Sequence, residues 1–381
     1  MNFTFDTVPN IIFETGAAAR LGDIIKPRMS RPFVVTDRGV VGAGLIDWTL
    51  KSLQQAGLDH ALFEGVQADP PARTVKAAVE AARAHRADGV IGFGGGSSMD
   101  TAKIIAVLMN SNQTLEDIYG QDNVKAPRAP LVLLPTTAGT GSEVTNISVI
   151  TTEDDQKMGV LAPQLYADLA VLDPSLTLSM PRHVTAATGI DAMVHAIEAY
   201  TTKLKKNPVS DALAKEALRL LSANIQRACE APDDVEARGA MLLGAMLAGQ
   251  AFANAPCAAV HAMAYPLGVH FHVPHGLANA LMLAPVLRHN IPAAAPLYAE
   301  LGDVIGADGT GDFTMRAESF VAKMGEICVA TGVKSRLSEV GVSHNVLPKL
   351  AEDAAKIERL MKNNPREVTY DDALRLYTEV L

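Results

Sequence analysis

The stretch GVIGFGGGSSMDTAK, residues 89–103, decides the fold of the first half of the chain. An apolar segment at 89–93 runs into Gly94, Gly95 and Gly96, and a strong helical pattern follows over 97–109. Consecutive glycines allow positive φ and let the backbone approach a ligand with no Cβ in the way. Unpaired N–H groups at a helix start favour pyrophosphate binding. The stretch therefore predicts a strand, a phosphate-binding turn and a helix.

Two polar residues at the start of this helix bear on the same interpretation. Ser97 is expected to cap the helix, with Asp100 three residues later as its capping-box partner. However, Ser97 stands where the usual dinucleotide fingerprint GxGxxG has its third glycine. The alternative interpretation is a tight strand-to-helix turn followed by a well-capped helix without a ligand.

The flanking sequence extends this unit into an alternation of strands and helices. The expected strands lie at 33–36, 58–63, 89–93 and 131–134, and the expected helices at 45–56, 74–85 and 97–109. Such alternation predicts a parallel sheet covered by helices on both faces.

Beyond about residue 180 the pattern becomes helical. Long segments rich in Ala, Leu and Met have helical period at 183–202, 208–228, 234–254 and 314–331. Residues 291–312, rich in Ala, Pro, Gly and Asp, are expected to form an irregular connection. We therefore predict an α/β dinucleotide-binding domain over 1–180 and an all-helical domain over 181–381.

A second polar cluster, PTTAGTGSEVT, follows the strand expected at 131–134. Its threonines are Thr136, Thr137, Thr140 and Thr145. Hydroxyls at the carboxyl end of a strand suit a phosphate or a nicotinamide ribose, although a Ser/Thr-rich turn is the competing interpretation. Asp37 ends an earlier expected strand, where it could accept hydrogen bonds from an adenosine ribose or cap its own turn.

Composition excludes several classes of partner. The chain of 381 residues has a net charge of −9 and no long basic run, which disfavours nucleic acid. Its three cysteines are widely separated, so neither a disulfide framework nor a structural zinc knuckle is expected. The N-terminus lacks the pattern of a signal peptide, and apolar runs fall short of the ~20 residues that span a bilayer. We expect a cytoplasmic protein with no membrane partner.

The helical half carries a clearer chemical pattern. Asp191 and His195 are four residues apart within an apolar stretch, so they share one helix face. A buried carboxylate and imidazole need partners, and a divalent metal would satisfy both. A later block, AVHAMAYPLGVHFHVPHGLANA, contains the histidines His261, His270, His272 and His275.

From these residues, Asp191, His195, His261 and His275 would form a site of three nitrogens and one oxygen. That set leaves room for a substrate oxygen or water and suits either Zn²⁺ or Fe²⁺. Any single histidine of this kind is more often a satisfied structural residue. Glu198, one turn beyond His195, either supports a ligand from behind or faces solvent.

Four motifs together resemble the iron-containing (group III) alcohol dehydrogenases. They are GGGSSMDTAK, PTTAGTGSE, ATGIDAMVHAIEAY and the block HAMAYPLG…HVPHG, in that order, and the similarity runs nearly end to end. The resemblance implies a dehydroquinate-synthase-like architecture and a homodimer or higher homo-oligomer. It also implies NAD and one divalent metal, with Fe²⁺ favoured over Zn²⁺.

The resemblance also assigns residues. It places the metal on Asp191, His195, His261 and His275 and the pyrophosphate on Gly95, Gly96 and Ser97. Thr136, Thr137 and Thr140 would lie near the phosphates or the nicotinamide, and Lys157 would contact a cofactor ribose. Asp37 matches an aspartate that favours NAD, because a carboxylate repels the 2′-phosphate of NADP.

The sequence departs from the family pattern at two positions. Asp69 stands where members often have an asparagine near the adenine pocket. Tyr265 stands where many carry a histidine thought to assist proton transfer, so Tyr265 either joins the proton relay or only lines the site. His270 and His272 could substitute, but no motif supports them.

The expected activity is direct hydride transfer between a nicotinamide and a small alcohol or its aldehyde. The metal would act as a Lewis acid on the substrate oxygen. The alternatives are a maleylacetate-reductase-like or glycerol-dehydrogenase-like enzyme and, from another class, a metal-dependent hydrolase or a silent NAD-binding module. The sequence does not identify the substrate: Phe252, Cys257 and Ala258 either line its pocket or belong to the core.

Overall fold

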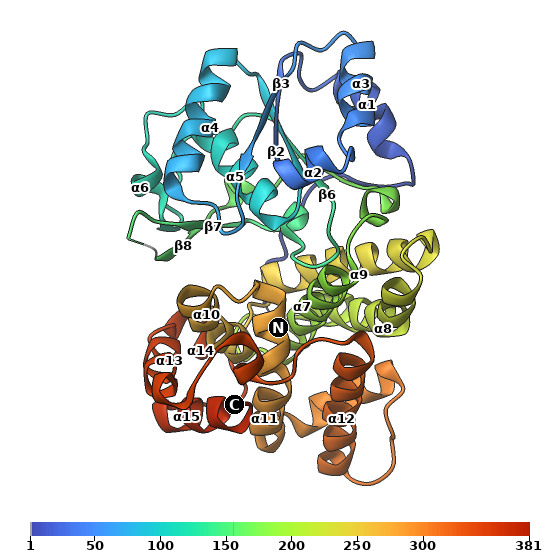
Figure 1. Cartoon of the computed structure of the whole chain (residues 1–381), viewed down its shortest axis with the longest axis vertical. Helices are drawn as coiled ribbons and strands as arrows, with labels where there is room; N and C mark the ends of the chain where they lie inside the picture. The colour runs from blue at the N-terminus through green and yellow to red at the C-terminus, as the bar shows by residue number, and fades with distance from the viewer. Residues whose placement is uncertain (1, 155) are drawn as a thin grey trace. The chain divides into compact units, whose positions relative to one another are not determined.

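The computed structural model describes residues 2–154 and 156–381, which form two compact units (Figure 1). One unit is Thr7–Ser179, and the other is Met180–Leu381 together with residues 2–6. The first is an α/β unit and the second is helical in all its described regular elements, which confirms the predicted fold class. Residues up to Asp6 join the helical unit because Asn254 accepts from the Asp6 amide and donates to its carbonyl, both at 2.8 Å.

The α/β unit is built on a six-stranded sheet in which every pairing is parallel. The strand order is β1-β9-β6-β4-β2-β3. The strands are β1 (Ile11–Phe13), β2 (Pro32–Asp37), β3 (Ala61–Val66), β4 (Gly89–Gly94), β6 (Leu131–Pro135) and β9 (Leu169–Leu172). The central strands are buried on both faces, as expected of near-continuous apolar runs in a parallel sheet.

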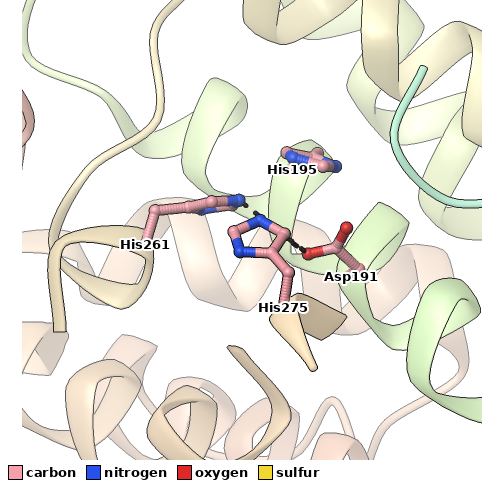
Figure 2. Close-up of side chains that lie close together, drawn as sticks. All are labelled: Asp191, His195, His261 and His275. Atoms are coloured by element: carbon pink, nitrogen blue, oxygen red, sulfur yellow. Dashed lines mark ion pairs between the residues drawn. The ribbon is translucent and has the colours of Figure 1, made fainter. Parts of the chain in front are cut away.

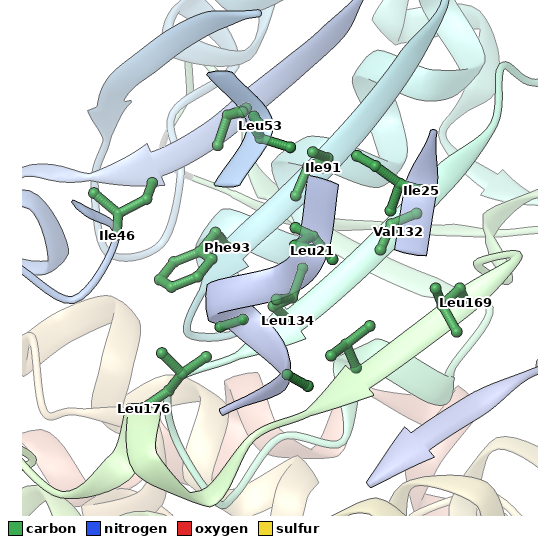
Figure 3. Packing of buried hydrophobic residues seen from close by; sticks show 14 of the residues in the cluster. Leu21, Ile25, Ile46, Leu53, Ile91, Phe93, Val132, Leu134, Leu169 and Leu176 are labelled. Atoms are coloured by element: carbon green, nitrogen blue, oxygen red, sulfur yellow. The ribbon is translucent and has the colours of Figure 1, made fainter. Parts of the chain in front are cut away.

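Helices cover both faces of this sheet. One face packs on α1 (Leu21–Ile25) and α3 (Asp47–Gln55) through a core of alternate strand residues (Figure 3). That core includes Leu21, Ile25, Leu53, Ile91, Phe93, Val132, Leu134 and Leu169. The other face is covered by α4 (Ala72–His85) and α5 (Gly96–Leu108).

The order of the strands creates a switch point between β2 and β4. The chain passes from β2 outward to β3 and then returns to β4 on the opposite side of β2. In open α/β sheets, ligands bind beyond the carboxyl ends of the strands at such a point. Here those ends carry Asp37 and Gly94.

A small second sheet, absent from the sequence expectations, lies beside α5. It pairs β7 (Ile147–Thr151) with β8 (Lys157–Leu161) as an antiparallel hairpin, and the short β5 (Gly120–Gln121) runs parallel to β8. The remaining helical segments of this unit are η1 (Ala17–Arg20), α2 (Arg38–Gly42), α6 (Leu115–Ile118), η2 (Ser142–Val144), η3 (Pro163–Leu165) and η4 (Pro174–Thr177).

The helical unit contains all four of the predicted long helices, each close to its expected position. These are α7 (Arg182–Thr201), α8 (Pro208–Glu230), α9 (Val235–Asn254) and α12 (Phe313–Thr331). The others are α10 (Ala259–Phe271), α11 (His275–Ile305), η5 (Leu337–Val340), η6 (His344–Val346), α13 (Leu347–Ala355), α14 (Glu358–Met361) and α15 (Tyr370–Glu379).

The prediction of an irregular connection over 291–312 was wrong. Helix α11 continues to Ile305 despite internal prolines at 285, 292 and 296, and it ends at Gly306, whose φ is 70°. Ile291, Ala294, Tyr298 and Leu301 are buried with helical spacing. Burial of this face outweighs the missing proline hydrogen bonds, so only the short segment after Gly306 is irregular.

No single helix in the described part of the chain is long and apolar enough to cross a membrane. Helices α9 and α10 together are long and apolar enough, but they are bent by 105° relative to each other.

Candidate active site

Four side chains from three helices converge inside the helical unit (Figure 2). Asp191 and His195 lie on α7, His261 on α10, and His275 is the first residue of α11. Each offers one ligand atom, and these atoms all lie within 4.8 Å of one another. The structure therefore brings together all four residues that the sequence selected as metal ligands.

A close helix contact holds His275 at this cluster. A Cβ on Gly276 would lie 2.4 Å from the carbonyl oxygen of Ala187 on α7, so only glycine allows this approach. Ala187 lies one turn before Asp191, and the contact brings the start of α11 to the level of the Asp191 carboxylate. His275 Nε2 then lies 3.6 Å from Asp191 Oδ1.

Asp191 is buried and remains ionised. Burial alone would raise the pKa of Asp191, but the charges of His275, His195 and His261 and a hydrogen bond from Asn279 outweigh it and lower that pKa. Asn279 Nδ2 donates to Asp191 Oδ1 at 2.5 Å and lies 3.2 Å from His275 Nε2. The sequence analysis missed Asn279, although its position one turn after His275 was a usable signal.

Glu198 faces the cluster rather than solvent, which resolves the two expectations for this residue. It is buried, and its carboxylate accepts from the Ala258 amide at 2.9 Å and the Val260 amide at 2.7 Å. Its Oε2 also lies 2.6 Å from His261 Nδ1. Glu198 therefore holds the start of α10 and orients the His261 ring through Nδ1, so that Nε2 faces Asp191.

The residues present fit a divalent metal. The buried Nε2 of His261 has no hydrogen-bond partner within the described chain, and Asp191 Oδ1 is 3.9 Å away. A buried imidazole nitrogen without a partner requires an explanation, and its carboxylate-backed ring is the arrangement found in metal-ligating histidines. Three imidazoles and one carboxylate suit Fe²⁺ or Zn²⁺.

Aromatic and apolar side chains border this cluster. The Phe252 ring stacks on His195 with centroids 4.3 Å apart, and the Tyr265 ring lies 5.9 Å from that of His275. His270 and His272 do not join the four ligands: His270 Nε2 lies 2.8 Å from an Asp353 oxygen, and His272 ends α10 with a φ of 53°. The expectation that either could substitute in the relay has no geometric support.

The glycine turn of the α/β unit lies at the switch point of the sheet. Gly94 has a φ of 147°, and Gly95 precedes the first turn of α5 with no side chain capping the helix. The prediction that Ser97 and Asp100 form a capping box was therefore wrong. The first amides of α5 are left without intrahelical partners, so this turn fits a cofactor pyrophosphate.

Asp37 lies against this turn. Its Oδ1 accepts from the Val40 amide at 3.0 Å, which caps α2, and its Oδ2 accepts from Ser98 Oγ at 3.4 Å. The Asp37 carboxylate therefore caps its own turn and also borders the glycine segment. The two interpretations of Asp37, as a cap and as a ribose contact, are compatible with each other.

The hydroxyl segment is fastened to α5 by buried charges. Lys103 Nζ donates to Ser142 Oγ at 2.8 Å, to Thr145 Oγ1 at 3.1 Å and to the Ile147 carbonyl at 2.8 Å. Asp100 accepts from Ser142 Oγ at 2.6 Å and from the Val149 amide at 2.9 Å. Asp100 does not form the predicted capping box, because these tertiary partners occupy its carboxylate oxygens.

Lys103 on α5 and Glu143 in the hydroxyl segment both have perturbed pKa values. Burial lowers the pKa of Lys103 to about 8 and raises that of the Glu143 carboxyl to about 7. Both side chains are fully withdrawn from water, which disfavours their charged forms.

The threonines of the same segment meet the glycine turn. Thr137 is 3.7 Å from the Cβ position of Gly95, and Thr140 is 2.9 Å from that of Gly96. Thr136 donates its amide to the Gly94 carbonyl at 2.9 Å. The structure therefore places Thr136, Thr137 and Thr140 beside the turn, while Thr145 is engaged with Lys103.

Lys157 is paired with the residue that departs from the family pattern. Its Nζ lies 2.7 Å from Asp69 Oδ1, and Asp69 has a φ of 50°. Thr151 holds the same loop by donating its hydroxyl to the Asp69 carbonyl at 3.1 Å and its amide to the Pro70 carbonyl at 3.0 Å. Since Asp69 follows β3, the pair lies beyond the same carboxyl edge of the sheet as Asp37.

Comparison with known proteins extends over the whole chain. Residues 9–174 match the family described as iron-containing alcohol dehydrogenase, and residues 185–381 match the C-terminal region of the Fe-containing alcohol dehydrogenase family. Sulfoacetaldehyde reductase of Bilophila wadsworthia is 36% identical over 99% of this chain and 98% of its own length.

Two solved structures are similar throughout. A 1,3-propanediol oxidoreductase has a TM-score of 0.97 and 32% identity, with both chains covered completely. A sulfoacetaldehyde reductase from Bifidobacterium kashiwanohense, solved with NAD⁺, has a TM-score of 0.89 and 28% identity, covering 100% of this chain and 99% of its own.

The α/β unit with its glycine turn, followed by helices carrying one carboxylate and three imidazoles, defines an oxidoreductase of the alcohol dehydrogenase class. The chain belongs to the family of iron-containing alcohol dehydrogenases. It interconverts an alcohol and a carbonyl compound, and these relatives favour that reaction over the hydrolase alternative.

Replacing Glu198 with glutamine should weaken metal binding by roughly 10- to 100-fold, because the amide orients the His261 ring less strongly. Metal affinity would be measured by competition with a chelator at fixed pH. The control is Glu300→Gln on α11, which removes a carboxylate bonded to Tyr200 and Lys215. Equal affinities in the two variants would contradict this role for Glu198.

Replacing Glu143 with glutamine should change the pH dependence of stability. Because the folded pKa of about 7 exceeds the ordinary carboxyl value, the folded state binds this proton more tightly, and stability falls as pH rises toward 7. Because glutamine does not titrate, the variant lacks this loss of stability. The free energy of unfolding of the variant relative to the parent should rise by roughly 1–3 kcal/mol between pH 5 and pH 8.

Denaturant unfolding at both pH values measures this effect. Glu64→Gln on β3, where the side chain is exposed, serves as the control and should follow the parent protein. If the free energy of unfolding of Glu143→Gln changes with pH in the same way as that of Glu64→Gln, Glu143 does not titrate near pH 7.

Proposed function

We propose that this protein interconverts small primary alcohols or diols and their aldehydes by direct hydride transfer, using NAD(H) and Fe²⁺ held by Asp191, His195, His261 and His275. The observation that carries the proposal is the convergence of these four side chains around a buried His261 Nε2 that has no hydrogen-bond partner in the described structure. Zn²⁺ suits the same donors, and the family favours iron.

The cluster also has an open side. Asp191, His195 and His261 are buried, whereas the His275 side chain is 33% exposed. A substrate oxygen would therefore approach past His275. A bound metal would supply Lewis-acid polarisation of that oxygen, while Phe252 and Tyr265 exclude water from the reacting groups.

Tyr265 is the proposed proton carrier. Its hydroxyl oxygen accepts from Arg359 Nη2 at 3.4 Å, which leaves the hydroxyl hydrogen directed elsewhere. During aldehyde reduction, that hydrogen would pass to the developing alkoxide. This role rests on the closeness of the Tyr265 and His275 rings.

The α/β unit would bind NAD(H), which supplies the hydride acceptor or donor. Gly94, Gly95, Gly96 and Ser97 would hold the pyrophosphate through backbone amides, with Thr136, Thr137 and Thr140 nearby. Asp100 and Thr145 would position this segment from behind through their contacts with Ser142 and Lys103.

Two carboxylates favour NAD over NADP. Asp37 would accept from the adenosine ribose and repel a 2′-phosphate. Lys157, the cation that could attract such a phosphate, is already paired with Asp69. The departure from the family asparagine at Asp69 therefore supports NAD as the cofactor.

The first test combines metal content with turnover. Protein purified anaerobically without chelators should contain about one metal per chain by elemental analysis and should oxidise NADH with propanal. Asp191→Asn should lose the metal and reduce turnover by roughly a thousandfold, since metal polarisation contributes several kcal/mol to the transition state. Asp303→Asn, which breaks an exposed pair with Arg316, is the control.

Metal-free parent protein that still reduces propanal would refute the metal mechanism. Protein that neither binds NADH nor reduces any aldehyde would refute the proposed function as a whole.

Replacing Asp69 with asparagine should weaken the preference for NAD. The change frees Lys157 to pair with a 2′-phosphate, so NADPH should bind about five- to tenfold more tightly while NADH changes by less than about threefold. Dissociation constants from nicotinamide fluorescence would measure this. Asp122→Asn is a matched control, because Asp122 is also exposed with a positive φ of 57°. An unchanged ratio of the two constants in Asp69→Asn would refute this account of selectivity.

A further inference from the structure

One cation near the cluster of Asp191, His195, His261 and His275 has no contact with substrate in the mechanism above, where it only donates to the Tyr265 hydroxyl. Arg359 lies on α14, and its guanidinium is 5.9 Å from the centre of the Tyr265 ring. The Tyr265 ring is in turn 5.9 Å from that of His275. The three side chains therefore form a continuous row from a candidate metal ligand to a positive charge.

The charge of Arg359 is not neutralised by a carboxylate of the described chain. Some exposed arginines have such a partner, as Arg219 has Glu216, whereas Arg359 is an unpaired arginine that lies beside a side chain of the candidate site. No carboxylate of the described chain lies within 4.0 Å of the Arg359 guanidinium, which contacts the hydroxyl and the ring of Tyr265. Its planar fork of donors suits an anionic group with two or more oxygens.

The backbone beneath Arg359 is held at a set distance from the cluster. Asn363 is buried, and its Nδ2 donates to the Arg359 carbonyl at 3.0 Å and to the Cys257 carbonyl at 2.7 Å. Cys257 immediately precedes the turn that Glu198 fastens next to His261. Asn363 therefore links the backbone of Arg359 to the segment next to His261.

Apolar side chains occupy the space around this row. Cys257, Ala262 and Leu360 form a buried cluster on which Phe252, Tyr265, Ile357 and Met361 pack. A short aliphatic chain would contact this surface favourably, and an anionic group at its end would pair with the exposed Arg359 guanidinium. A neutral substrate would leave the arginine without a partner.

We propose that Arg359 receives the anionic end of the substrate, so that the preferred substrates are short aldehydes or alcohols carrying a sulfonate, carboxylate or phosphonate at the far end. This inference rests on the proposed function, because the reacting oxygen is taken to lie at the cluster. Arg359 thereby determines substrate specificity, and Tyr265 keeps the guanidinium in place by accepting a hydrogen bond from it.

Steady-state kinetics with NADH and two aldehydes of similar size test the proposal: sulfoacetaldehyde, which is anionic, and propanal, which is neutral. The holoenzyme should have a higher kcat/KM for sulfoacetaldehyde by about tenfold or more. Arg359→Met should lower the ratio of kcat/KM for sulfoacetaldehyde to kcat/KM for propanal by roughly 10- to 100-fold, mainly through the KM of sulfoacetaldehyde, because any effect through the Tyr265 hydroxyl is common to both aldehydes. Arg359→Lys should recover part of the loss, since it keeps the charge but not the planar fork.

Lys362→Met is the matched control, because Lys362 is also an exposed cation of this segment, and it is Arg359 that bonds the Tyr265 hydroxyl. It should leave both substrates unchanged. Equal losses for both aldehydes in Arg359→Met would mean that the arginine only supports the local structure, and this would overturn the proposal. Equal kcat/KM values for the two aldehydes in the parent enzyme would overturn it as well.

The outcome also separates this inference from the proposed function. A parent enzyme that reduces both aldehydes with NADH, together with an unchanged Arg359→Met, refutes only the anionic-substrate inference. A parent enzyme that reduces neither aldehyde refutes both.

Discussion

Asp191 holds a charge away from water among three imidazole rings, and the packing of the helical unit depends on how that charge is satisfied. An isolated buried carboxylate would be strongly destabilising, so it needs cations or donors from other elements. Helices α10 and α11 supply His261, His275 and Asn279, while Glu198 on α7 anchors the start of α10. The contacts that satisfy this charge are therefore the contacts that assemble the site.

The α/β unit meets a comparable requirement with a different solution. Its parallel strands end at one edge, where α5 starts without a side-chain cap. Lys103 is buried behind this start, Asp100 is half-buried beside it, and both bond the hydroxyl segment next to the glycine turn. Burying the Lys103 charge is costly, but its hydrogen bonds fix the hydroxyl segment to α5. A preorganised turn reduces the ordering cost of binding a cofactor there.

Predictions were accurate where the deciding interactions are local. The four-residue spacing of Asp191 and His195 places both on one face of any helix, and apolar periodicity located α7, α8, α9 and α12 within a few residues. They were inaccurate where a distant partner competes. Asp100 bonds Ser142 and Val149 instead of capping α5, and the buried face of α11 overrides three prolines. The hairpin β7–β8 was also missed, although its two strands are adjacent in the sequence.

Periodicity, spacing and ordered motifs were enough to predict the class of the fold, the family and the four residues of the cluster. The packing of the helices was needed to show that Glu198 orients His261, that Asn279 supports Asp191, and that Arg359 lies beside Tyr265. These pairs are 63, 88 and 94 residues apart. Contacts over such separations arise from the packing of helices against each other, which no local pattern in the chain encodes.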